Sequence, residues 1–128
     1  MTRRPLPEDP GLREAIRAVR DKKGWDLVVL DLRPVTTFFD YFLIASGHTA
    51  DHLRAIADRL QETLEDLGLR LHHVEGYDHG TWILMDFEYL IVHLFRPETR
   101  SYYSLESLWG DVPSWKLPDD ETKPEENP

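Results

Sequence analysis

Two carboxylates stand at a spacing that metal-dependent transferases use to hold Mg²⁺. Asp86 and Glu88 lie two residues apart, directly after an apolar stretch with the composition of a strand. An enzyme of this kind also needs a Gly-Ser turn upstream that cradles phosphates. Residues 46–47 read Ser-Gly, in reversed order and distant, and residues 76–77 read Gly-Tyr, without the hydroxymethyl group. A Mg²⁺-dependent nucleotidyltransferase that uses Asp86 and Glu88 is therefore the alternative hypothesis rather than the preferred one.

The histidines raise the question of a metal site. The candidates in this part of the chain are His72, His73, His79 and His93, with Asp78. His72 and His73 are neighbours on an expected strand, so their side chains point to opposite faces. His93 lies inside an apolar strand and is expected to be a hydrogen-bonded core histidine. The chain has no cysteine, phosphate-binding loop or Gly-x-Ser-x-Gly elbow. We therefore predict no metal ligand, no cofactor and no catalytic residue.

Large aromatic side chains alternate with acids over residues 75–109. The aromatics include Tyr77, Trp82, Phe87, Tyr89, Tyr102, Tyr103 and Trp109, and the acids are Glu75, Asp78, Asp86, Glu88, Glu98 and Glu106. Aromatic anchors surrounded by charge are typical of protein interfaces. The alternative is that these rings belong to the core. Trp82 and Leu84 lie on one face of their strand, and Ile83 and Met85 lie on the other face. Only one of the two faces can be the more buried.

The charge of the chain favours a basic protein as partner. The 128 residues hold 15 basic and 24 acidic side chains, a net charge of −9. Residues 24–115 alone carry −9, whereas residues 1–23 carry +3. Phosphate backbones repel such an acidic body, so we expect no direct nucleic-acid readout. No signal-peptide run or membrane-spanning stretch is present, and we expect a soluble, cytoplasmic protein.

Hydrophobic periodicity predicts a single domain of alternating helices and strands over residues 10–115. The expected helices cover 12–19, 50–67 and 98–108, and the expected strands cover 25–33, 41–46, 69–75, 81–86 and 89–95. This order, αββαβββα, predicts an α/β or α+β fold with a mixed five-stranded sheet flanked by helices. The second strand is apolar on both faces, which is typical of strands covered by helices on both sides. Residues 1–9 and the acidic, proline-rich residues 116–128 are expected to be disordered.

Several motifs in a fixed order resemble those of the ribosomal silencing factor family, also called the Iojap-like family. They are residues 30–33 (Leu-Asp-Leu-Arg), 40–47 (Asp-Tyr-Phe-Leu-Ile-Ala-Ser-Gly), 55–58 (Ala-Ile-Ala-Asp), 75–76 (Glu-Gly), 82–86 (Trp-Ile-Leu-Met-Asp), 92–95 (Val-His-Leu-Phe) and 100–109 (Arg-Ser-Tyr-Tyr-Ser-Leu-Glu-Ser-Leu-Trp). The match covers residues 12–109, and the order and spacing of the motifs together are specific. Two departures stand out. Asp51 replaces an arginine of the family pattern, and Glu88-Tyr89 replaces Gly-Asp.

The resemblance implies a translational repressor. Family members bind the large ribosomal subunit through its ribosomal protein fourteen, a basic β-barrel, and block joining of the small subunit when nutrients are short. They are usually homodimers when free, and their fold is similar to that of nucleotidyltransferases without the catalytic signature. On this basis, and from the aromatic and acidic pattern above, the predicted partner-binding residues are Tyr77, Asp78, Trp82, Leu84, Asp86, Glu88, Tyr103, Glu106 and Trp109.

Overall fold

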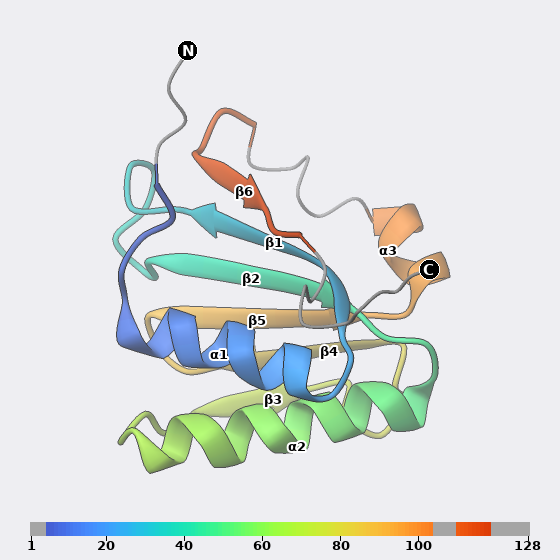
Figure 1. The fold of residues 1–128 in the computed structure, drawn as a ribbon. Helices are drawn as coiled ribbons and strands as arrows, with labels where there is room; N and C mark the ends of the chain where they lie inside the picture. The colour runs from blue at the N-terminus through green and yellow to red at the C-terminus, as the bar shows by residue number, and fades with distance from the viewer. Residues whose placement is uncertain (1–4, 104–109, 119–128) are drawn as a thin grey trace.

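The computed structural model describes residues 5–103 and 110–118 and shows a mixed six-stranded sheet (Figure 1). The strands are β1 (Trp25–Asp31), β2 (Tyr41–Ser46), β3 (His73–Glu75), β4 (Trp82–Asp86), β5 (Leu90–Phe95) and β6 (Ser114–Lys116), and they lie in the order β3-β4-β5-β2-β1-β6. β2 and β5 are parallel, and every other pair is antiparallel. The predicted mixed sheet is confirmed, with one strand more than expected.

Two long helices, α1 (Pro10–Asp21) and α2 (Ala50–Asp66), cover one face of the sheet (Figure 1). Each begins at a side chain that accepts a hydrogen bond from a free backbone N–H of the first turn. Asp9 accepts from the Leu12 N–H at 3.0 Å, and Thr49 accepts from the His52 N–H at 3.0 Å. Both helices agree with the predictions. No helix among the described residues is long and apolar enough to cross a membrane.

The main core lies between these helices and the sheet. Its fully buried members include Leu12 and Val19 of α1, Leu53, Ile56 and Leu60 of α2, and Leu43, Ile83, Val92 and Leu94 of the strands. All six residues of β2 are buried, as expected for a central strand.

A second, smaller cluster lies on the opposite face of the sheet. Its buried members are Val28, Leu30, Leu32, Phe42, Ile44, Ile91, Phe95 and Val112. They come from β1, β2 and β5 and from two loop positions, and none comes from a helix. The expectation that helices cover both sides of β2 is met only in part: beside these strand and loop side chains, Arg100 of the short helix α3 (Pro97–Tyr103) donates to the Ser46 hydroxyl at the end of β2 at 2.8 Å.

The sixth strand was not predicted. β6 pairs antiparallel with β1 at the sheet edge, and Trp115 reaches the main core with 5% of its surface exposed. Lys116 belongs to this strand, and Leu6 packs against the same core. The sheet and the core thus include residues on both sides of 10–115. A three-residue edge strand next to a proline-rich acidic stretch shows too little alternation to be recognised from sequence.

Two further elements are shorter than expected. β3 begins at His73, since Leu69 and Leu71 pack against the main core without joining the sheet. α3 (Pro97–Tyr103) begins at the predicted proline. Its predicted continuation to residue 108 lies outside the described residues, as do Glu106 and Trp109.

Candidate protein-binding face of the sheet

Alternate side chains of β4 lie on the surface of the sheet opposite α1 and α2. Trp82 and Leu84 are half-buried there and pack against the second cluster. Ile83 and Met85 alternate with them and are buried under the helices, which settles which face of this strand belongs to the main core. We call the opposite surface the far face. It comprises Trp82, Leu84 and Asp86 of β4, Ile91, His93 and Phe95 of β5, and Phe42 and Ile44 of β2.

Aromatic rings pack against one another across the far face. The Trp82 and Phe95 rings are stacked with centroids 5.0 Å apart, on directly opposed residues of β4 and β5. The Phe42 and His93 rings meet edge to face at 4.6 Å. Offset and edge-to-face arrangements stabilise aromatic pairs by about 0.5–1.5 kcal/mol beyond simple burial. The ring positions on this face are therefore held by packing.

His93 connects this packing to Trp82. Its Nδ1 accepts a hydrogen bond from the indole Nε1–H of Trp82 at 3.1 Å, so the imidazole proton resides on Nε2. Nε2 is buried and makes no hydrogen bond with any described residue. The side chain is 3% exposed, and burial lowers the pKa of His93 to about 4. The prediction of a hydrogen-bonded core histidine is confirmed, and a neutral imidazole fixes the orientation of the Trp82 ring.

Acidic side chains border the far face where β4 ends. The Asp86 carboxylate accepts a hydrogen bond from the Glu88 N–H at 2.7 Å and closes the turn between β4 and β5. Glu88 has a φ of +83°, and its carboxylate lies 3.4 Å from Nε2 of His72. Glu75 of β3 pairs directly with Leu84 of β4, so its side chain also lies on the far face. This edge of the far face is acidic.

The same geometry argues against a magnesium site. Asp86 is engaged in the turn, and Glu88 is drawn toward His72. Within the described residues no three histidine, aspartate or glutamate side chains are grouped closely enough to hold a metal ion.

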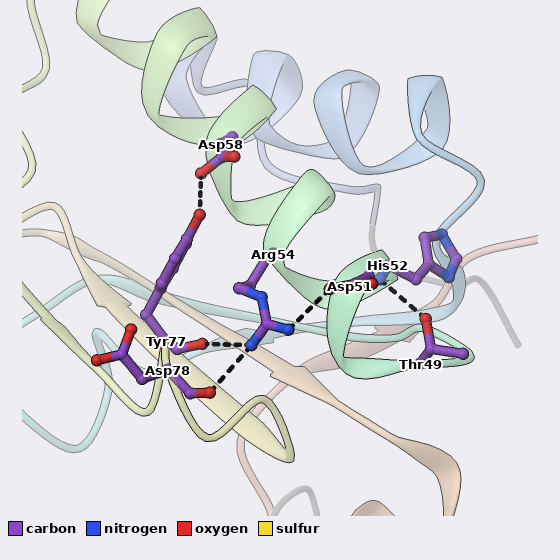
Figure 2. A network of polar contacts seen from close by, with 7 residues as sticks. All are labelled: Thr49, Asp51, His52, Arg54, Asp58, Tyr77 and Asp78. Carbon is purple, nitrogen blue, oxygen red and sulfur yellow. Dashed lines mark hydrogen bonds and ion pairs between the residues drawn. The ribbon is translucent and has the colours of Figure 1, made fainter.

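Tyr77 and Asp78 lie on the other side of the sheet, against α2 (Figure 2). The Tyr77 hydroxyl donates to Asp58 at 2.8 Å, and this bond together with burial raises the pKa of Tyr77. Arg54 donates to the backbone carbonyls of Tyr77 and Asp78 at 3.1 and 3.0 Å. Its second guanidinium nitrogen lies 2.8 Å from Asp51. These contacts fasten the turn at residues 76–80 to α2, so Tyr77 and Asp78 do not share a surface with Trp82.

The predicted set is thus only partly brought together. Trp82, Leu84 and Asp86 share the far face, and Glu88 lies in the turn at its edge. Tyr103 ends α3, in a part of the helix whose side chains are not described. Sequence reasoning missed Phe42 and Phe95 as members of this face. Their signal was present as strand alternation, but it becomes usable only once β2, β5 and β4 are known to be neighbours.

The fold is that of an α/β protein, and the half-buried Trp82 and Leu84 on its far face are suited to contact rather than catalysis. The family model for "Ribosomal silencing factor during starvation" matches residues 6–128. The ribosomal silencing factor of Halalkalibacterium halodurans is 37% identical over 106 residues, which cover 83% of this chain and 91% of that protein. The Bacillus subtilis factor is 37% identical over 102 residues, 80% of this chain and 86% of that protein.

A solved structure shows the same architecture. The crystal structure of a Chromobacterium violaceum protein superposes with a TM-score of 0.78 at 31% sequence identity, covering 91% of this chain and 98% of that one. The chain belongs to the ribosomal silencing factor family. This family consists of regulators of the ribosome and not of enzymes.

Proposed function

We propose that the chain represses translation by binding the large ribosomal subunit and blocking its union with the small subunit when nutrients are limiting. The receptor in this proposal is ribosomal protein fourteen, and the repressor acts by occupying space without any chemical step. Membership of the silencing factor family supports the function, and the far face supports the mode of binding.

The observation that carries the proposal is the position of Trp82. Its ring is half-buried, stacked on Phe95 and oriented by His93, so it is held in place before any partner arrives. A rigid aromatic side chain loses little conformational entropy on binding, and such side chains dominate the energy of protein interfaces. Leu84 lies next to it on the same strand and extends the apolar centre.

The acidic border suits a basic partner. Glu75 and Glu88 have side chains that are 68% and 78% exposed, which is typical of residues at the rim of an interface. Rim charges mainly steer association and set its salt dependence, and contribute less to the final affinity. The same carboxylates would be repelled by the surrounding ribosomal RNA. A basic ribosomal protein is therefore a better receptor for this surface than RNA.

Subunit joining tests the proposal directly. Purified large and small subunits are mixed with excess protein, and joined ribosomes are quantified on a gradient. We expect the wild-type chain to reduce the joined fraction and Trp82→Ala to restore it, since loss of a central anchor typically costs about 2 kcal/mol or more in binding. Leu67→Ala is a matched control, because this exposed residue follows α2 on the helix side. Unchanged joining at saturating wild-type protein would disprove the proposal.

A second measurement distinguishes the contribution of a rim charge from that of the central anchor Trp82. Time-resolved binding of Glu88→Gln to large subunits is expected to show slower association and weaker salt dependence. Co-sedimentation of the same variant should show a smaller loss of affinity than Trp82→Ala. We also propose that the free chain is a homodimer, as the family resemblance implies. Sedimentation velocity of the isolated protein checks this, and a monomer at micromolar concentration would contradict it.

A further inference from the structure

The loop between β1 and β2 holds the most exposed large apolar side chains of the described residues. Phe38 is 86% exposed, and Val35 is 56% exposed. Burying a phenylalanine side chain stabilises a protein, and this fold forgoes most of that gain at Phe38. A lone exposed valine is unremarkable, but an almost fully exposed phenylalanine close to a second apolar residue needs an explanation.

The loop holds these side chains in a defined conformation. The N–H groups of Val35 and Thr36 both donate to the Leu32 carbonyl at 3.0 Å, and the Phe38 N–H donates to the Thr36 hydroxyl at 3.1 Å. The Leu32 N–H donates to the Asp40 carbonyl at 2.8 Å and closes the loop at its base. Phe38 is therefore presented by an ordered backbone, which reduces the entropy lost when a partner binds it.

Charged residues flank the loop. The positive charge of Arg33 is neutralised by a neighbouring carboxylate, whereas the residues at the other end of the loop are acidic. Arg33 donates from Nε and Nη2 to the two carboxylate oxygens of Asp31, both at 2.9 Å, so its positive charge is locally paired. The Asp40 N–H donates to the Tyr89 carbonyl at 2.7 Å, which joins the loop to the turn that contains Glu88. The β1–β2 loop and the β4–β5 turn lie at the same end of the sheet (Figure 1). The end that carries Phe38 therefore also carries Asp40 and Glu88 and is acidic.

The loop continues the far face. Phe39 packs against the second cluster, and its ring lies 5.2 Å from that of Phe42. Phe38 is the adjacent residue, with its Cα about 3.8 Å from that of Phe39. The loop that presents Phe38 is therefore joined to the far face through Phe39.

We propose that Phe38, with Val35 of the same loop, is a second apolar anchor for the basic protein proposed to bind the far face. This inference rests on the proposed function and adds a binding element on a different segment of the chain. The acidic end argues against a second copy of the chain as occupant, because a two-fold contact would bring Asp40 and Glu88 of both copies together. It also argues against an anionic membrane surface, which favours basic neighbours.

The test compares Phe38→Ser with wild type, Trp82→Ala and Leu67→Ser for binding to purified large subunits. We expect Phe38→Ser to weaken binding about tenfold or more, with its melting temperature unchanged because the side chain is already exposed. Phe38→Leu should keep most of the affinity, since it restores an apolar side chain. Leu67→Ser places the same change on an exposed apolar residue of the helix side and should bind like wild type.

The possible results separate the two proposals. Failure of the wild-type chain to bind large subunits would remove the proposed function itself. Binding by wild type that is lost in Trp82→Ala but retained in Phe38→Ser would overturn the second anchor and leave the proposed function intact. If Phe38→Ser dissociated a homodimer and left subunit binding unchanged, the loop would be an interface between copies and the second anchor would again be wrong.

Discussion

Acidification is expected to destabilise the fold through His93. The pKa of the buried imidazole is lowered to about 4 by loss of hydration, whereas the unfolded chain has the ordinary value of about 6.5. The unfolded state therefore takes up the proton first as the pH falls. The stability contributed by the neutral side chain is complete above about pH 6.5 and is lost progressively down to about pH 4. Between pH 7 and pH 5 this amounts to about 2 kcal/mol of unfolding free energy.

Urea unfolding of wild type and His93→Asn at pH 7 and pH 5 measures this contribution. Asparagine does not titrate, and its amide oxygen can take the place of Nδ1 as acceptor for the Trp82 N–H. All other ionisable groups are shared, so the difference between the two pH dependences isolates His93. We expect wild type to lose about 2 kcal/mol more than the variant between these pH values. His79→Asn, at an exposed position of the turn, is the control and should follow wild type.

Protonation of His93 should also change the packing of the far face. Protonation of Nδ1 would set two donors against each other across the 3.1 Å contact with the Trp82 Nε1–H, so the indole would lose its partner on His93. Tryptophan fluorescence and near-ultraviolet circular dichroism of the folded wild type should therefore change near pH 4, where the native imidazole takes up its proton. An equal loss of stability in wild type and His93→Asn would refute the reasoning, because the titrating group would then lie elsewhere.

Three further changes test the placement of other side chains. Tyr77→Phe removes the bond to Asp58 and should cost about 1 kcal/mol in urea unfolding; weakened large-subunit binding would contradict its position on the helix side. Thr49→Ala removes the cap of α2 and should also cost about 1 kcal/mol, whereas Thr49→Ser should cost little; equal effects of the two variants would argue against a capping role. Trp115→Ala should cost about 3–5 kcal/mol in the same assay, since the ring is buried in the main core; a cost below about 1 kcal/mol would contradict that packing.

The elements that sequence predicts well are those with signals inside their own segment. α2 has a capping threonine before it, an apolar stripe along it and Gly68 with a φ of +89° after it. β2 is apolar at nearly every position. β6 lacks such signals, because its pairing with β1 and the burial of Trp115 depend on residues about 85 positions earlier in the chain.

In the candidate site, too, the sequence predicts what depends on a single segment and fails where contacts between distant segments decide. Strand alternation correctly separates Trp82 and Leu84 from Ile83 and Met85, although it does not say which pair belongs to the main core. Tyr77 lies only five residues before Trp82, and the aromatic and acidic pattern groups the two in one binding set. A turn intervenes, and the direction in which it sends the chain depends on its contacts with α2, which the sequence does not display.

The distribution of charge relative to the sheet adds to the choice of receptor. The basic part of the chain includes Arg13 and Arg17, and both are exposed on α1, on the side of the sheet opposite the far face. Glu75 and Glu88 border the far face itself. When the far face of such a chain approaches a surface made mostly of RNA, the phosphates repel its acidic border. The repulsion is absent only where a basic protein covers the RNA at the point of contact. The same charges that attract the proposed receptor therefore oppose attachment of this face anywhere else on the subunit, and specificity follows from repulsion as well as from fit.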